Sequence, residues 1–252
     1  MQSKRDSAEA REAIEKYFTG NASAYYKVDN SKTSEFIRTF CKGKLEFVDS
    51  PDLVISDGNK VIIVEHFEFD GYKSAIKGSK NRIEQARIDR IAEAVTPTEE
   101  GAMYHDQING DSSLKNYESN AMLQFSKHYE KIEKYKNRIR QLGISNDNSE
   151  VQVVFLMEDK SPLGTLVHDG TKTHAVNLAH NRNFLEFYME KPNVDYVLNC
   201  FCAFNQSLVW IIPHSQLREY EEDILQYEKM QFISSTPQVI GFTTLIPKTE
   251  YD

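Results

Sequence analysis

The chain has 252 residues, of which 40% are hydrophobic and 27% are charged, so it can bury a substantial core within one compact unit. The formal net charge of -8 at pH 7 argues against a uniformly basic surface that coats nucleic acid, although it allows a local basic groove. Its three cysteines include no C-x-x-C pair, so they support neither a disulfide framework nor a zinc knuckle. No stretch approaches the ~20 apolar residues of a membrane span, and the polar N-terminus lacks the apolar core of a signal peptide. We therefore expect a cytoplasmic protein that does not enter a membrane.

Two helices and three strands are predicted for the first part of the chain. Alanines among Glu and Lys favour a helix over residues 7–18, and apolar residues at helical spacing favour a second helix from about residue 31, which Gly43 ends. Strands are expected at residues 45–48, 53–56 and 61–69. The turn Asp57-Gly58-Asn59 joins the last two strands as an antiparallel hairpin.

The middle of the chain is predicted to hold two helices separated by a loop. Residues 72–94 favour a basic helix, and residues 96–117, rich in Gly, Asp, Asn and Ser, favour a long loop. The clearest helix covers residues 117–142, where large apolar residues recur at three- and four-residue steps and Gly143 ends the run. Residues 151–157 are almost unbroken apolar sequence, which is typical of a strand buried on both faces.

The last part of the chain is predicted to add strands and one charged helix. The strands are expected at residues 164–167, 174–178, 196–204, 207–212 and 238–245, and the helix at residues 215–230. Helices and strands mixed in this order indicate an α/β or α+β class. We expect a single domain over residues 1–252, in which residues 158–252 extend the sheet or form the surface of a homodimer.

Two acidic residues stand out in the hairpin. Asp52 precedes its first strand, and Glu65 follows four aliphatic residues in its second strand, on the same strand face as Val61 and Ile63. An ionised carboxylate among apolar neighbours is costly unless it is paired, and a Mg²⁺ or Mn²⁺ ion held by Asp52 and Glu65 is one such partner. Purely structural roles also stay open: Asp52 bonds nearby backbone at the start of a strand, and Glu65 forms an ion pair with a basic helix.

This part of the sequence resembles the PD-(D/E)XK nuclease superfamily, the fold of restriction endonucleases. The match consists of the pair Pro51-Asp52, the short hairpin, Glu65 at the end of the next strand, and Glu35 in the upstream helix. The resemblance implies a restriction endonuclease-like mixed sheet flanked by helices, with core order helix, three antiparallel strands, helix, strand. Residues 31–157 follow this order if the segment at about 96–117 is an insertion. The resemblance also makes Asp52 and Glu65 metal ligands and Glu35 a supplementary acid.

The sequence departs from the family at the motif's lysine, two residues after the second acid, where Phe67 stands. Such a lysine positions the attacking water or offsets charge in the transition state. The residues available to replace it are Lys73, Lys77, Lys127 and Lys131, and Lys131 completes the candidate catalytic set. His66, on the opposite face of the strand from Glu65, is either a polar residue at the strand's end or a general base.

Two basic segments suggest DNA as the partner. The candidate contacts are Lys73, Lys77, Lys80, Arg82, Lys127 and Lys134. Each segment alone is typical of a solvated helix face, but together they would flank the acids and form a groove for phosphates. The predicted function is therefore Mg²⁺- or Mn²⁺-dependent hydrolysis of DNA. Two alternatives stay open: a catalytically inactive nuclease-fold protein that binds nucleic acid or a protein, and an unrelated α/β interaction protein whose acids are structural.

Overall fold

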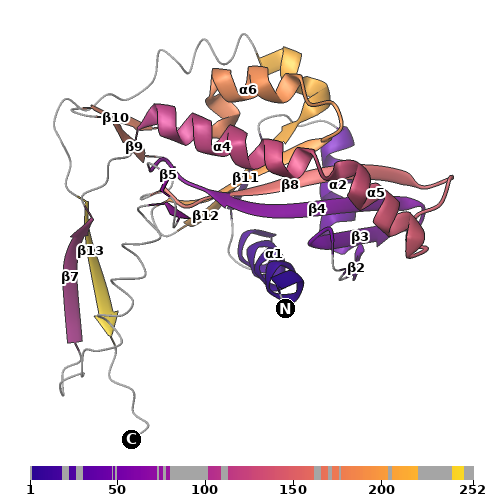
Figure 1. Ribbon diagram of the computed structural model, residues 1–252, viewed down its shortest axis with the longest axis horizontal. Coiled ribbons are helices and arrows are strands. Elements are labelled where there is room, and N and C mark those ends of the chain that lie inside the picture. The colour runs from indigo at the N-terminus through magenta and orange to yellow at the C-terminus, as the bar shows by residue number, and fades with distance from the viewer. Residues whose placement is uncertain are drawn as a thin grey trace, which may run out of the picture.

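A mixed β-sheet runs through the protein and carries helices on both faces, as seen in the computed structural model (Figure 1). The structure describes residues 2–18, 23–26, 31–46, 48, 50–72, 74–75, 78–79, 102–108, 113–161, 166–169, 172–175, 177–203, 206–220 and 240–246. The mixed α/β class predicted from the sequence, with a mixed sheet flanked by helices, is confirmed.

The main sheet has seven strands in the order β1-β12-β11-β8-β4-β3-β2. These strands are β1 (Ser23–Tyr26), β2 (Lys44–Glu46), β3 (Leu53–Asp57), β4 (Lys60–Phe69), β8 (Glu150–Asp159), β11 (Tyr196–Ala203) and β12 (Gln206–Pro213). Strands β2, β3 and β4 are antiparallel neighbours, whereas β4, β8 and β11 run parallel. Strand β12 returns antiparallel to β11 and pairs in parallel with β1.

The two central strands are buried on both faces, which explains their apolar sequences. All side chains from Val61 to Phe67 in β4 and from Val153 to Asp159 in β8 are buried. Parallel strands covered by helices on both sides favour such apolar runs. The hairpin between β3 and β4 turns at Gly58, whose φ of 63° lies in the left-handed region that glycine adopts without steric cost.

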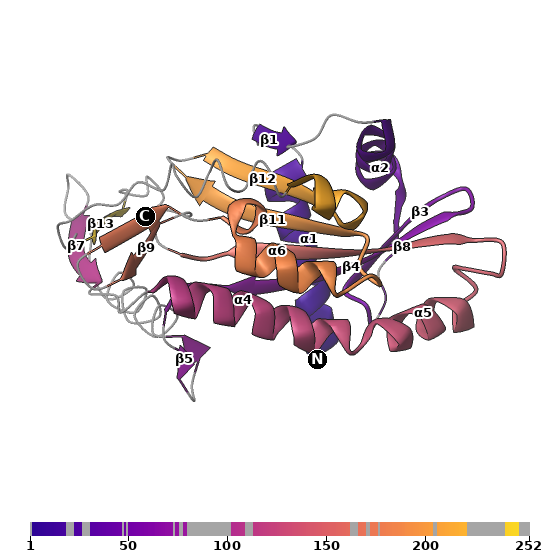
Figure 2. The ribbon, with the colours of Figure 1, turned by 90° about the horizontal axis from the view of Figure 1, so that it is seen from above.

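Helices form a layer on each face of the sheet (Figure 2). On one face α1 (Gln2–Phe18) and α2 (Ser31–Lys42) pack Tyr17 and Phe36 against Ile62 and Leu156. The opposite face is covered by α4 (Leu114–Tyr129), α5 (Ile132–Gln141) and α6 (Arg182–Met189), which contribute the largest cluster of buried side chains. None of the helices in the described ranges is both long and apolar enough to cross a bilayer.

Among the described residues, several elements predicted for residues 31–157 occur in the predicted order. Helix α2 is followed by the three antiparallel strands β2, β3 and β4, then by α4 and α5, and then by β8. The insertion falls between β4 and α4. The segment predicted at about residues 96–117 is not only a loop, because it contains β7 (Ala102–Ile108). Strands β5 (Ser74–Ala75) and β6 (Gly78–Ser79) precede it.

The basic helix predicted over residues 72–94 is wrong at its start, where β5 and β6 form a short antiparallel hairpin. Gly78 lies in this hairpin, and glycine disfavours a helix interior. Residues 80–101 lie outside the described residues. The loop predicted over 96–117 contains β7, which pairs with β13 (Ile240–Ile246) as a ribbon apart from the main sheet (Figure 1).

The long helix predicted over residues 117–142 is two helices, and it begins earlier, because Ser113 caps the N-terminus of α4 through a bond from the backbone N–H of Asn116. The break follows Tyr129, where the backbone N–H of Lys131 donates to the carbonyl of His128 at 3.1 Å. This hydrogen bond joins residues three positions apart, as in a 3₁₀ helix, and it tightens the last turn of α4. Neither Gly nor Pro occurs there to reveal the break in the sequence.

The C-terminal part differs from prediction in its helices more than in its strands. Strands β11 and β12 extend the main sheet as expected, and β9 (Leu166–Asp169) pairs with β10 (Lys172–Ala175). Helix α6 and the short η1 (Leu178–His180) were not predicted. The helix predicted from residue 215 begins as the 3₁₀ helix η2 (His214–Tyr220), and residues 221–239 lie outside the described residues.

Candidate functional site

Asp52 and Glu65 lie next to each other on the sheet face that α4 and α5 cover. Leu53 pairs with Val64, so continuing this register by one residue sets Asp52 opposite Glu65. Burial raises the pKa of Tyr135 on α5 far above its ordinary value, and the charges of Glu65 and Asp52 raise it further. Both carboxylates therefore act on the same phenol, and the structure brings together the two residues that the sequence predicts as metal ligands.

Asp52 is anchored where the two strands separate. Its Oδ2 accepts a hydrogen bond from the backbone N–H of His66 at 2.9 Å. Strand β3 begins at Leu53, whereas β4 continues to Phe69, so the end of β4 has no backbone of β3 opposite it. The Asp52 carboxylate accepts the hydrogen bond that a backbone carbonyl of β3 would otherwise accept. The expected bond to nearby backbone is therefore present, and it holds the half-buried Asp52 beside Glu65.

Glu65 is a buried carboxylate with one satisfied oxygen and one unsatisfied oxygen. The residue is 4% exposed. Its Oε1 lies 2.6 Å from Nδ1 of His128 on α4 and accepts a second hydrogen bond from the Tyr135 hydroxyl. Its Oε2 is buried and has no hydrogen-bond partner in the described part of the chain. A buried anionic oxygen without a partner is costly, and a bound cation is one group that would offset this cost.

Two carboxylates are the described side chains that could hold a cation at this position. Among the residues that the structure describes, no three His, Cys, Asp or Glu side chains group as a metal-ligand set. Mg²⁺ is commonly bound through one or two carboxylates and retains several waters. Two carboxylates are within the number that Mg²⁺ or the similar Mn²⁺ takes from a protein, and they are too few for a metal that requires a complete shell of protein ligands.

An aromatic pair occupies the position of the missing lysine. Phe67 is 6% exposed, and its ring stacks on the His128 imidazole with centroids 4.4 Å apart and planes 9° from parallel. It also meets Phe155 edge to face at 5.4 Å. His128 is not among the site residues predicted from the sequence. The sequence does contain an indication of this residue. Phe125, His128 and Ile132 follow one another at helical spacing, which places a histidine on the buried face of the helix.

Of the lysines proposed to replace the motif lysine, the structure describes Lys127 and Lys131, and neither forms a described ion pair with Glu65. Lys131 is exposed at the junction of α4 and α5, and the structure shows no ion pair between it and Glu65. Lys127 and Lys134 are exposed on the same two helices. The other predicted contacts, Lys73, Lys77, Lys80 and Arg82, lie outside the described residues.

Glu35 lies far from the two acids. It is exposed on α2, which packs on the opposite face of the sheet, and it forms an ion pair with Lys60 at the start of β4. Glu65 follows Lys60 by five residues along the strand, a separation of roughly 17 Å at the usual rise of a strand. The structure therefore does not bring Glu35 to Asp52 and Glu65.

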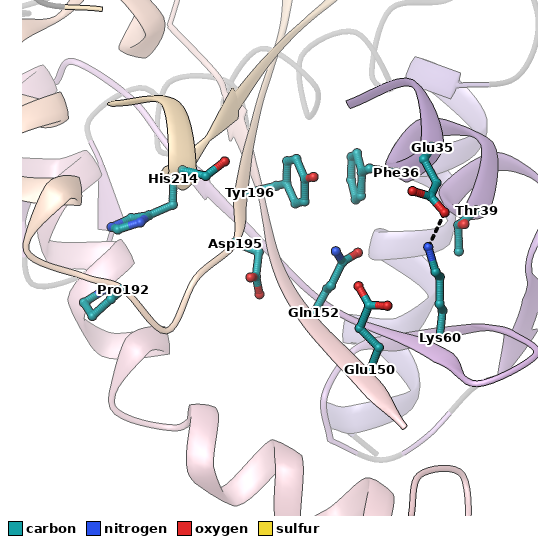
Figure 3. Close-up of a pocket in the computed structure, with 11 residues that line it drawn as sticks. Glu35, Phe36, Thr39, Lys60, Glu150, Gln152, Pro192, Asp195, Tyr196 and His214 are labelled. Atoms are coloured by element: carbon teal, nitrogen blue, oxygen red, sulfur yellow. Dashed lines mark hydrogen bonds and ion pairs between the residues drawn. The ribbon is translucent and has the colours of Figure 1, made fainter. Parts of the chain in front are cut away.

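Glu35 instead lines a cavity of about 400 Å³ at the other end of the parallel strands. Figure 3 shows Glu150, Asp195 and Tyr196 on its walls, with the Glu35–Lys60 pair at one side. The Tyr196 ring stacks on Phe36 with centroids 3.9 Å apart. Burial raises the pKa of Tyr196 to about 12, with further contributions from the charges of Asp195, Glu150 and Glu35. This cavity is separate from the candidate metal site.

His66 faces away from Glu65, as strand alternation predicts. Its Nε2 lies 3.3 Å from Oε2 of Glu158 on β8. Glu158 also accepts bonds from Lys16 and Tyr17 of α1, both at 3.0 Å, and Lys160 lies 2.7 Å away. The side chain of His66 therefore belongs to a buried polar network under α1, and only its backbone N–H contacts Asp52.

Comparison with known proteins does not assign the site. No protein-family model matches the chain, and no curated protein or solved structure matches it.

Proposed function

We propose that this protein is a divalent-metal-dependent nuclease-like protein that hydrolyses DNA phosphodiester bonds, with Asp52 and Glu65 holding Mg²⁺ or Mn²⁺. The observation that carries the proposal is the buried Oε2 of Glu65, which has no partner in the described residues and lies on the face where Asp52 is anchored. The order of elements from α2 to β8 supports it, because this is the core order of the PD-(D/E)XK fold. Membership of that superfamily is part of the proposal.

Three contacts prepare the two acids for a cation. The backbone N–H of His66 fixes Asp52, while His128 and Tyr135 together occupy Oε1 of Glu65. The second oxygen of Glu65 is thereby left for the metal. A bound divalent ion would supply an activated water and stabilise charge on the leaving oxygen.

DNA would be held by basic residues beside these acids. Lys127 on α4, Lys134 on α5 and Lys131 at the junction of the two helices are exposed, and these helices supply His128 and Tyr135. Lys73, Lys77, Lys80 and Arg82 remain predicted contacts. A cytoplasmic location and a homodimer likewise remain predictions.

The second candidate is a catalytically inactive protein of the same fold that binds nucleic acid or a protein. It is favoured by the position of the motif lysine, where Phe67 is buried against His128. A hydrophobic ring there neither positions water nor offsets transition-state charge. Both candidates contain the same pair of acids, so cleavage and metal binding have to be measured separately.

The test compares thermal unfolding and DNA cleavage with and without Mg²⁺ or Mn²⁺. A cation at 100 times its Kd stabilises the folded protein by about 2.7 kcal/mol, which raises Tm by about 5–10 °C in a domain of this size. We expect this rise in the wild type and its loss in Asp52→Asn and Glu65→Gln. Glu35→Gln is the matched control, since it removes a carboxylate far from the site, and should keep the full rise.

Cleavage of plasmid and linear DNA then separates the two candidates. Metal-dependent cleavage that disappears in Glu65→Gln supports the nuclease. Metal binding without cleavage, together with DNA binding that weakens steeply with salt, supports the inactive binding protein. A wild type whose Tm does not respond to either ion contradicts the metal site in both candidates.

A further inference from the structure

Phe67 stands at the position of the motif lysine on β4, so another group must support Glu65. Glu65 and Phe67 are two residues apart and face the same side of the strand. The Phe67 ring lies against the His128 imidazole, and that imidazole contacts Glu65. The strand therefore contributes a packing surface at this position, and the polar group comes from α4.

The contact defines which nitrogen of His128 carries the proton. Oε1 of an ionised Glu65 can only accept, so the Nδ1 that lies 2.6 Å from it must donate. The imidazole is held in this orientation by its stack on Phe67, and its side chain is 17% exposed. A charged acceptor and a short donor distance make this a strong hydrogen bond.

We infer that His128 is the positioning residue of the metal site, which orients Glu65 through the Nδ1–H to Oε1 bond so that Oε2 is presented to the cation. This inference rests on the proposed function. Tyr135 donates to the same oxygen, so two donors fix the carboxylate plane. Hydrogen-bond partners of metal ligands typically change metal affinity by about 10–100-fold when they are removed.

The test measures the Kd for Mn²⁺ by calorimetry or by the paramagnetic resonance of free Mn²⁺, so it does not depend on catalysis. His128→Asn places an amide N–H close to the position of Nδ1, whereas His128→Gln places it one bond further out, near the position of Nε2. Both variants lose the stack on Phe67, so they differ chiefly in the position of the donor. We expect His128→Asn to stay within about threefold of the wild-type Kd and His128→Gln to bind about 10-fold more weakly or worse.

A third variant separates packing from donation. His128→Phe keeps an aromatic ring against Phe67 and removes the donor, so it should weaken Mn²⁺ binding about 10-fold or more while melting close to the wild type without metal. Should His128→Phe not fold, the Asn and Gln pair still decides the matter. Equal Mn²⁺ affinity in wild type, His128→Gln and His128→Phe overturns the role of His128 but leaves the two-acid site intact. A wild type that does not bind Mn²⁺ at all overturns the proposed function and this inference together.

Discussion

Glu65 and Glu158 lie on the neighbouring parallel strands β4 and β8, both 4% exposed, and they face opposite sides of the sheet. Their surroundings differ in kind. Glu158 is held by His66, Lys16, Tyr17 and Lys160, whereas Glu65 has two donors on one oxygen and none from the described residues on the other. Hydrogen-bond donors on several sides stabilise an ionised carboxylate. A buried carboxylate oxygen without a donor lacks this stabilisation. Glu158 therefore has a structural role, whereas Glu65 keeps one oxygen without a described partner, as the proposed metal site requires.

Glu158→Gln should lower the free energy of unfolding by roughly 1–3 kcal/mol, because it breaks charged hydrogen bonds that join α1 to the sheet. This loss is smaller than the loss usually caused by breaking a fully buried ion pair, because Lys16 and Lys160 are more than a third exposed. Urea unfolding at pH 7 measures the change. Glu186→Gln is the control, since its pair with Arg182 on α6 is exposed, and it should change stability by no more than about 0.5 kcal/mol.

The same carboxylate predicts how stability changes in acid. Burial alone would raise the pKa of Glu158, but hydrogen bonds from His66 and Lys160 and the charges of Lys160 and Lys16 hold it well below its ordinary value of 4.5. A carboxyl with a lowered pKa in the folded state contributes its stability above the unfolded pKa and loses it as the pH falls. The wild type should therefore lose stability below about pH 4.5, and Glu158→Gln should lose less over the same interval. Identical slopes in the two proteins would contradict this role.

Asp159, the next residue, should have the opposite effect in a different pH range. Burial raises its pKa to about 7, although it accepts bonds from the Ser161 backbone and the Tyr117 hydroxyl. Between about pH 4 and pH 7 the folded protein holds this proton while the unfolded chain releases it, so stability falls as the pH rises. Asp159→Asn should remove this fall. The check is the urea midpoint at pH 5 and at pH 8, and a pH difference in the variant as large as in the wild type would count against it.

The sequence predicted the hairpin, the position of the two acids and the faces of β4, because strand alternation and turn chemistry act locally. Three features depended on tertiary contacts and could not be found in this way. Strand β1 pairs with β12, which is distant in the sequence. The break after Tyr129 has no Gly or Pro to mark it, and His128 resembles a core histidine until β4 is placed beneath it. Glu35 shows the converse error, since an acid in the expected helix faces the wrong end of β4.

Phe67→Leu should test the aromatic support of His128. Leucine keeps an apolar side chain in the core but removes the stack on His128 and the edge contact with Phe155. Loss of two aromatic contacts and some buried volume should lower the free energy of unfolding by about 1–3 kcal/mol. Because the His128 imidazole is then less well held, Mn²⁺ affinity should also fall, by less than in His128→Phe. Leu123→Ala on the exposed side of α4 is the control, and it should affect neither quantity by more than a small amount.

Tyr135→Phe removes the second donor to Glu65. Tyr135 is 2% exposed, and burial together with the charges of Glu65 and Asp52 raises its pKa far above the ordinary value. The phenol therefore stays protonated and donates to Oε1 at neutral pH. Without it, His128 is the one donor to Glu65 among the described residues, and the buried carboxylate is less well satisfied. The free energy of unfolding should therefore fall by about 1–3 kcal/mol. In the proposed metal site Mn²⁺ would neutralise the same carboxylate, so saturating metal should restore part of this loss in Tyr135→Phe. Urea unfolding with and without the ion measures the recovery. A loss that is unchanged by Mn²⁺ would show that the cation does not act on Glu65.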